Sequence, residues 1–267
     1  MNAAQRSLPK RAALWHGLGE VPTDLGPTVL TIGVFDGLHR GHRSLIGRAR
    51  RTADERGLPL VMVTFDPHPA RVLGLPKDTA TLSTIAHRAE LAAAAGVDAV
   101  CVLHFTRELA RLSPEAFAAH CLAGRLRAKA VVVGANFTFG AKAAGDVGTL
   151  RALGADLGFS VEGVPLLPAK NSACSSTYTR NRLRSGDLPG VTHALGRPHR
   201  VDGFRMGDRI ILDANTALPP PGRYRARLND RPAVVDVLDD DSLRVADGTP
   251  GDGVAAVTFF ERAESGS

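Results

Sequence analysis

Thr31-Ile-Gly-Val-Phe-Asp-Gly-Leu-His-Arg-Gly-His42 carries two histidines three residues apart behind a turn rich in glycine. The residues just before it, 28–33, predict a short buried strand, and residues 44–56 predict the helix that follows. Backbone N–H groups and the positive end of a helix favour an anion at such a strand–turn–helix junction. The stretch therefore predicts a phosphate-binding turn.

Each residue of this turn has an expected role. His39 and His42 are predicted to donate imidazole N–H bonds to phosphoryl oxygens, whereas a single histidine near a helix start is more often a cap or a surface residue. Gly33 and Gly41 allow the backbone to approach a bound phosphate closely. Asp36 is interpreted as a turn-forming residue that orients the histidine loop. Together these residues indicate nucleotide handling.

Composition indicates a globular enzyme. The chain has 267 residues, of which 44% are hydrophobic, enough for one large domain and a small one. Its three cysteines form neither a zinc pattern nor a disulfide framework, which favours a reducing cytoplasm. The apolar runs are only as long as strands, and the N-terminus has no hydrophobic signal region, so neither a membrane span nor secretion is expected.

The net charge of +6 raises the question of nucleic-acid binding. The basic residues are scattered, many of them on predicted helices, and no nucleic-acid-reading motif accompanies them. A basic surface also suits an enzyme with anionic ligands. We therefore expect small-molecule partners, no nucleic acid and no membrane. The sequence does not indicate an oligomeric state.

Strand-like and helix-like segments alternate along the first part of the chain. This alternation predicts βαβ units and a parallel sheet, with ligands at the carboxyl ends of the strands. The segments in question are 60–65, 87–95, 99–103, 114–124 and 130–134.

Several further motifs carry a family resemblance. The segment GVFDGLHRGH resembles the ATP-binding signature of the HxGH nucleotidylyltransferase superfamily, and its surroundings resemble the adenylyltransferase module of bacterial bifunctional riboflavin kinase/FAD synthetases. The resemblance extends, in the family's order and spacing, to about residue 200. The other matching segments are VTFDPHP (63–69), LSPEAF (112–117), VVGANFTFG (132–140), SSTYTR (175–180) and LGRPH (195–199).

The resemblance implies an architecture. We expect an α/β, Rossmann-like nucleotidylyltransferase domain with a parallel sheet in residues 1–187. A small β-rich, barrel-like domain, reduced from a riboflavin kinase module, is expected in residues 188–267. Its strands are predicted near 223–228, 233–237, 242–245 and 254–260, where apolar and polar residues alternate.

The segment VVGANFTFG is predicted to line the flavin and nucleotide pockets. Gly134 ends a valine-rich strand, and Asn136 then offers a neutral donor and acceptor at the strand mouth. Phe137 and Phe139 would point to opposite sides if the chain stayed extended, so that one ring could stack on a flavin, although phenylalanine is more often a core residue. Phe65 is likewise either the last core residue of a strand or, with Pro67, part of the family's flavin loop.

The SSTYTR segment resembles the family's second phosphate-binding element, before a helical stretch expected at 181–184. Ser and Thr also cap ordinary helices, so the hydroxyls alone are a weak signal. Arg180 is predicted to bind two oxygens of the pyrophosphate leaving group. The family usually has an aliphatic residue at the position of Thr179, a departure that could perturb the packing of Arg180.

The resemblance implies adenylyl transfer from ATP to FMN, with release of pyrophosphate and with Mg²⁺ neutralising charge. The chain residues expected to act in catalysis are His39, His42, Arg180 and Asn136. The residues expected to bind the two nucleotides are Gly33, Phe35, Asp36, Gly41, Phe65, Pro67, Phe137, Phe139, Ser175, Ser176 and Thr177. No metal ligand is assigned.

The last quarter of the chain departs from the family pattern. Where a bifunctional member has a glycine-rich loop and a PTAN motif, this chain has a shortened loop and Leu212-Asp213-Ala214-Asn215. Asp236 lies near the position of the family's catalytic glutamate. We therefore expect a chain without riboflavin kinase activity. Two alternatives stay open: a paralogue that uses another phosphorylated acceptor or another nucleotide such as CTP, and a non-catalytic flavin- or nucleotide-binding protein.

Overall fold

The structure is a computed structural model that describes residues 11–165, 174–246 and 251–263. Within these limits the chain forms two compact units. Of the described residues, 11–35, 42–77 and 89–165 form the first unit, and 36–41, 78–88, 174–246 and 251–263 form the second.

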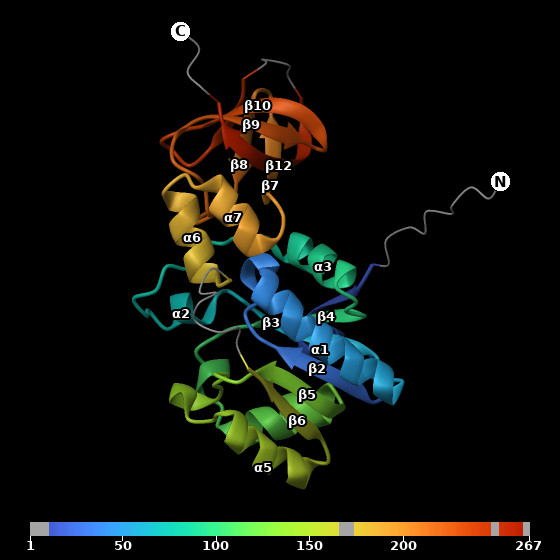
Figure 1. Ribbon diagram of the computed structural model, residues 1–267. Coiled ribbons are helices and arrows are strands. Elements are labelled where there is room, and N and C mark those ends of the chain that lie inside the picture. Colours follow the sequence, from blue (N-terminus) through green and yellow to red (C-terminus); the bar gives the residue numbers. More distant parts are fainter. Residues whose placement is uncertain (1–10, 166–173, 247–250, 264–267) are drawn as a thin grey trace, which may run out of the picture. The chain divides into compact units, whose positions relative to one another are not determined.

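The first unit contains a six-stranded parallel sheet in the order β1-β4-β3-β2-β5-β6 (Figure 1). This arrangement confirms the α/β fold and the parallel sheet. The strands are β1 (Ala13–His16), β2 (Thr28–Ile32), β3 (Leu60–Asp66), β4 (Ala99–His104), β5 (Ala128–Gly134) and β6 (Ser160–Val164). The helices between them are α1 (Arg40–Arg56), α2 (Pro69–Val72), α3 (Ile85–Ala94), α4 (Pro114–Ala116), the π-helix η4 (Phe117–Arg125) and α5 (Val147–Leu157).

The central strands are apolar because both faces of a parallel sheet are covered. Every residue of β2 is buried, and the two threonines at positions 28 and 31 are buried with it. The buried hydroxyl of Thr28 donates to the carbonyl of Leu126 at 2.6 Å, and this hydrogen bond offsets the loss of its contacts with water. Since β2 lies between β3 and β5, the residues that follow these three strands leave the same edge of the sheet.

The second unit contains a closed antiparallel barrel in the order β10-β11-β8-β7-β12-β9. Closure leaves no unpaired strand edge. The barrel confirms the expected small β-rich part of the chain. Its strands are β7 (His199–Met206), β8 (Arg209–Leu212), β9 (Gly222–Leu228), β10 (Arg231–Val237), β11 (Leu243–Val245) and β12 (Gly253–Arg262), and the helices of this unit are α6 (Ser176–Arg184) and α7 (Leu188–Leu195).

Two aromatic residues dominate the barrel core. Tyr224 and Phe259 are fully buried, with ring centroids 5.6 Å apart in an edge-on contact. The Tyr224 hydroxyl donates to the carbonyl of Pro220 at 2.7 Å, so its polar end is satisfied. The neighbouring Phe260 is 40% exposed, because adjacent residues of a strand face opposite sides.

Some element boundaries differ from expectation. Helix α1 begins at Arg40 and not at residue 44, so Gly41 and His42 lie in its first turn. Helix α6 begins at Ser176 and not at residue 181, since Ser175 caps it by accepting from the Tyr178 N–H at 3.1 Å. Both helix starts are polar and lack the apolar spacing by which sequence reveals a helix.

The described chain begins close to its first strand. Residues 1–10 lie outside the described residues, and Ala13 pairs with Ala99 as the first residue of β1. Strands β1, β6, β7 and β8 were not anticipated: β1, β6 and β8 are short and only partly buried, and only His199 and Val201 of the longer β7 are buried. Among the described residues, no helix is long and apolar enough to cross a membrane.

We predict that Phe259→Ala destabilises the second unit by about 3–5 kcal/mol, because it removes a fully buried ring and leaves a cavity. Phe260→Ala is the matched control on the same strand; it loses mainly a contact with Arg227, whose guanidinium lies 5.5 Å from the ring centroid, and should cost about 1 kcal/mol or less. Urea unfolding followed by circular dichroism measures both. Equal losses in the two variants would contradict this account of the core.

Candidate functional site

The turn that follows β2 has an unusual backbone. Phe35, Gly37 and Leu38 all have positive φ, at 52°, 77° and 36°. A side chain on Gly37 would be strained by this conformation, and its Cβ would lie 3.0 Å from the Cβ of Leu82. The glycine is therefore required by both backbone geometry and space. Its N–H donates to the hydroxyl of Ser83 at 3.0 Å.

The Asp36 carboxylate is the centre of a buried network in the second unit. It accepts from the backbone N–H of Leu82 at 3.0 Å and from that of Ser83 at 3.1 Å. The Arg180 guanidinium donates to it at 2.6 Å, and that of Arg88 at 3.4 Å. The Asp36, Arg88 and Arg180 side chains are each 5% exposed or less, so this ion pair is shielded from solvent. Asp36 thus does more than form a turn: it fixes the turn to residues 80–88 and to α6.

Two more side chains hold the turn through its carbonyl groups. The Ser176 hydroxyl donates to the Asp36 carbonyl at 2.9 Å. Arg197 donates to the Gly37 carbonyl at 2.8 Å and, at 3.5 Å, to that of Leu38. Backbone atoms on both sides of Gly37 are therefore fixed by residues far away in sequence.

His39 lies within this network. It is 7% exposed, and burial, the largest effect, lowers its pKa from 6.5 to about 4. The Asp36 charge acts in the opposite direction, while Arg180 and Arg197 lower the pKa further. His39 is consequently a neutral imidazole near pH 7, with one N–H to donate.

In the first unit, His42 packs against Phe35. The two ring centroids are 5.1 Å apart with an edge-on geometry. Phe35 is fully buried, so it supports His42 and has no surface for a ligand. A Cβ on Gly33 would lie 3.3 Å from the Phe35 ring, which explains the glycine there by packing.

The residues after β3 and β5 lie at the same sheet edge. Phe65 is half-buried and contacts Phe105 edge-on at 5.7 Å, and Pro67 follows a cis peptide bond. Asn136 is exposed beyond the end of β5. These positions agree with an edge where ligands collect in parallel sheets, and their ligand roles stay predictions.

The expectation that Phe137 and Phe139 point to opposite sides is wrong. Their rings stack at 5.6 Å with an angle of 11° between planes. The chain does not stay extended after β5, since the Phe137 N–H bonds back to the Gly134 carbonyl at 2.9 Å. Phe139 is buried against Phe117, while Phe137 is only partly buried.

The SSTYTR residues have separate placements. Ser175 is the helix cap, Ser176 holds the turn, and Thr177 is exposed. Thr179 is fully buried, and its hydroxyl donates to the Ser175 carbonyl at 2.9 Å. The hydroxyl group, which an aliphatic residue would lack, therefore has a hydrogen-bond partner one helical turn earlier. Arg180 donates to Asp36 and, through Nε, to the Ala80 carbonyl at 2.6 Å.

Sequence reasoning missed Ser83, Arg88 and Arg197. Ser83 and Arg88 contact Asp36 from 47 and 52 residues away, and nothing in their local sequence indicates this. Arg197 lies in the LGRPH segment, which was recognised as family-like but given no role. Its place in that motif was the available signal.

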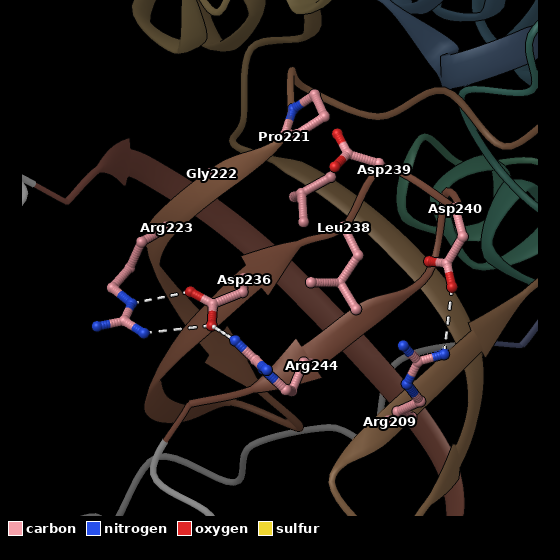
Figure 2. Close-up of a pocket in the computed structure, with 10 residues that line it drawn as sticks. Arg209, Pro221, Gly222, Arg223, Asp236, Leu238, Asp239, Asp240 and Arg244 are labelled. Atoms are coloured by element: carbon pink, nitrogen blue, oxygen red, sulfur yellow. Dashed lines mark hydrogen bonds and ion pairs between the residues drawn. The ribbon is translucent and has the colours of Figure 1, made fainter.

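In the barrel, Asp236 is bound by two arginines (Figure 2). Arg223 donates through Nε at 2.8 Å and through Nη2 at 3.3 Å, and Arg244 donates at 2.9 Å. Hydrogen bonding from Arg223 has the largest effect and lowers the Asp236 pKa. Burial raises this pKa, and hydrogen bonding from Arg244 lowers it further. Both carboxylate oxygens are thus occupied by guanidinium groups.

A model of the family described as FAD synthetase matches residues 21–178, a segment that includes the HxGH turn and strands β2 to β6 of the sheet. The chain belongs to the FAD synthetase family.

Curated relatives agree with this membership. A bifunctional riboflavin kinase/FMN adenylyltransferase of Pseudomonas fluorescens is 35% identical over 190 residues, which make up 71% of this chain and 61% of the relative. The protein of the same name from Escherichia coli K12 is 33% identical over 70% of this chain and 59% of its own length. The chain thus spans about three-fifths of the length of these relatives.

A solved structure shares the fold of this FAD synthetase family member. It is titled macrolide-efflux protein from Streptococcus pneumoniae, is 22% identical, and aligns with a TM-score of 0.79 over 96% of this chain and 92% of its own. At this identity the likeness shows the fold alone.

We predict that acid destabilises the second unit below pH 6.5. Burial lowers the pKa values of His39, His87 and His199 to about 4, 3 and 4. Below pH 6.5 the unfolded chain then binds more protons than the folded one. The free energy of unfolding therefore has its full value above the ordinary histidine pKa of 6.5 and falls as the pH drops toward 4. Each histidine should contribute a loss of about 1.4 kcal/mol per pH unit in that window.

Urea unfolding at several pH values between 6.5 and 5 measures this slope. His199→Gln should reduce it by about one histidine's share. His193→Gln is the matched control, because that side chain is exposed. A stability that does not change over this pH range would contradict the prediction.

Proposed function

We propose that this chain transfers the adenylyl group of ATP to the phosphate of FMN and so produces FAD and pyrophosphate. The observation that carries the proposal is the HxGH turn, which a buried ion-pair network holds in one conformation within the segment that matches the FAD synthetase family. Both nucleotides are anionic, in keeping with the basic charge of the chain.

The reaction is a direct displacement. A phosphate oxygen of FMN forms a bond to the α-phosphorus of ATP, and the bond from that phosphorus to the bridging oxygen breaks, so that pyrophosphate leaves with the electron pair. A phosphate monoester is already an anion near neutral pH, so neither a protein nucleophile nor a general base is required. The chain contributes mainly position and electrostatic stabilisation.

We assign the two histidines to the triphosphate. A neutral His39 donates one N–H to a phosphoryl oxygen without the cost of burying a charge, which its lowered pKa supports. His42, at the first turn of α1, adds a second donor near the positive end of that helix.

Arg180 has a positioning role in this proposal. Its Nη2 and Nε atoms already bind Asp36 and Ala80, so the guanidinium fixes the turn that carries His39. Direct contact with the leaving pyrophosphate stays a prediction for Arg180, as does phosphate binding for Ser175, Ser176 and Thr177.

For the flavin, we propose contacts from Phe65, Pro67 and Asn136, which follow neighbouring strands of the sheet. Phe137 joins them as a partly exposed ring that is held flat against Phe139. A fixed ring of this kind presents one face for stacking at little cost in entropy.

The described residues contain no group of three or more histidine, cysteine, aspartate or glutamate side chains that could hold a metal ion. The Asp36 carboxylate is occupied by arginines and backbone N–H groups. We therefore take Mg²⁺ to arrive with the triphosphate of the substrate, where it neutralises charge, and assign no protein ligand to it.

We further propose that the barrel does not phosphorylate riboflavin. Asp236 holds two guanidinium groups, and its lowered pKa makes it a poor proton acceptor. A cytoplasmic location is part of the proposal, supported by Cys101, Cys121 and Cys174, which form no disulfide with one another.

We predict that His42→Ala lowers kcat/KM for FAD formation about a hundredfold or more, because a donor to the developing charge is lost. His120→Ala, an exposed histidine of η4, is the matched control and should keep full activity. Pyrophosphate release from FMN and ATP measures the rate, and unchanged circular dichroism checks the fold. Full activity of His42→Ala would overturn the mechanism.

The same assay separates the alternative functions. A screen of phosphorylated acceptors against the four nucleoside triphosphates shows whether FMN with ATP is the preferred pair. Turnover only with another pair would make the chain a paralogue with a different substrate. Binding of FMN and ATP without pyrophosphate release would make it a non-catalytic nucleotide-binding protein.

For the barrel, we predict that incubation with riboflavin, ATP and Mg²⁺ yields no FMN. Chromatography with fluorescence detection measures the product, and a bifunctional relative serves as the positive control. Steady formation of FMN would contradict the proposed loss of kinase activity.

A further inference from the structure

The barrel carries an open cavity of about 830 Å³ (Figure 2). This volume is within the range of small-molecule sites. Pro221 and Leu238 give it an apolar part, and Arg209, Arg223 and Arg244 give it three guanidinium groups. The cavity thus combines an apolar surface with several strong hydrogen-bond donors.

Asp236 fixes two of these arginines in place. It is 10% exposed, whereas the side chains of Arg223 and Arg244 are 56% and 47% exposed. The carboxylate therefore binds the inner edges of two guanidinium groups whose remaining surfaces face solvent. Long side chains usually lose rotamer freedom on binding a ligand, and here that freedom is already reduced.

The charges around the cavity are unevenly distributed. Arg223 and Arg244 share one carboxylate, so this side has a net charge of one positive unit. On the other side, Arg209 is paired with Asp240 at 3.2 Å, and Asp239 adds a negative charge. An anionic group is attracted to the first side and repelled from the second, which orients a ligand in one direction.

We propose that this cavity binds a small molecule through a phosphate group held by Arg223 and Arg244, with an apolar part of the ligand on Pro221 and Leu238. A phosphate has three terminal oxygens in a tetrahedral arrangement and can accept from guanidinium groups on two different strands. A carboxylate is planar and is satisfied by a single guanidinium fork. The site binds its ligand without making or breaking a bond, and it is independent of adenylyl transfer.

Phenyl phosphate is the probe, because it joins a phosphate to an apolar ring; inorganic phosphate lacks the ring and phenol lacks the phosphate. Arginine Nε–H resonances in ¹⁵N-edited NMR spectra of the full chain report the site. We expect phenyl phosphate to shift the resonances of Arg223 and Arg244, inorganic phosphate to shift them with weaker affinity, and phenol to leave them unchanged. Unchanged Arg223 and Arg244 resonances at millimolar phenyl phosphate would overturn the proposal.

Variants separate this site from the HxGH turn. Arg223→Gln and Arg244→Gln should each weaken phenyl phosphate binding at the barrel about tenfold. Arg225→Gln is the matched control, since it lies on the same strand, removes the same charge and pairs with Glu261 outside the cavity. Equal weakening in the Arg225→Gln variant would show a general charge effect and overturn the proposal, as would binding that persists unchanged in the Arg223→Gln, Arg244→Gln double variant.

Discussion

A single buried carboxylate, that of Asp36, fixes the turn on which the proposed chemistry depends. Burying a carboxylate is costly unless charged and hydrogen-bonding partners replace water. Here two guanidinium groups and two backbone N–H groups replace it. Loss of Asp36 would leave two buried guanidinium groups without the carboxylate they share, so the network depends most on this one side chain.

This network decides to which unit the turn belongs. Residues 36–41 are part of the second unit, although β2 before them and most of α1 after them belong to the first. The reason is chemical: the partners of Asp36 come from residues 82–88 and from α6, and the carbonyl of Gly37 is held by Arg197. The pKa of His39 follows from the same burial, because desolvation and the two nearby arginines keep its ring neutral. The position of the turn and the protonation state of His39 therefore both result from this buried network.

The sequence predicts the four inner strands of the sheet, because valine-rich runs and a glycine-punctuated turn are local signals, and it misses the two edge strands β1 and β6. It predicts the phosphate-binding motif for the same reason. It does not predict the partners of Asp36, which lie up to 144 residues away, or the stacking of Phe137 on Phe139, which depends on a turn after Gly134. The polar helix starts at Arg40 and Ser176 are also hard to predict, and the second depends on the Ser175 cap and on the contact of Ser176 with the distant Asp36 carbonyl.

The same device, one aspartate with two arginines, occurs in two places in the second unit with opposite consequences. At Asp36 all three side chains are 5% exposed or less, so the arginines donate their hydrogen bonds to groups inside the protein and hold the turn in place. At Asp236 the carboxylate is buried, but the arginines are about half exposed, so their outer donors face a cavity. Burial, and not the identity of the residues, separates a structural ion pair from a potential anion site.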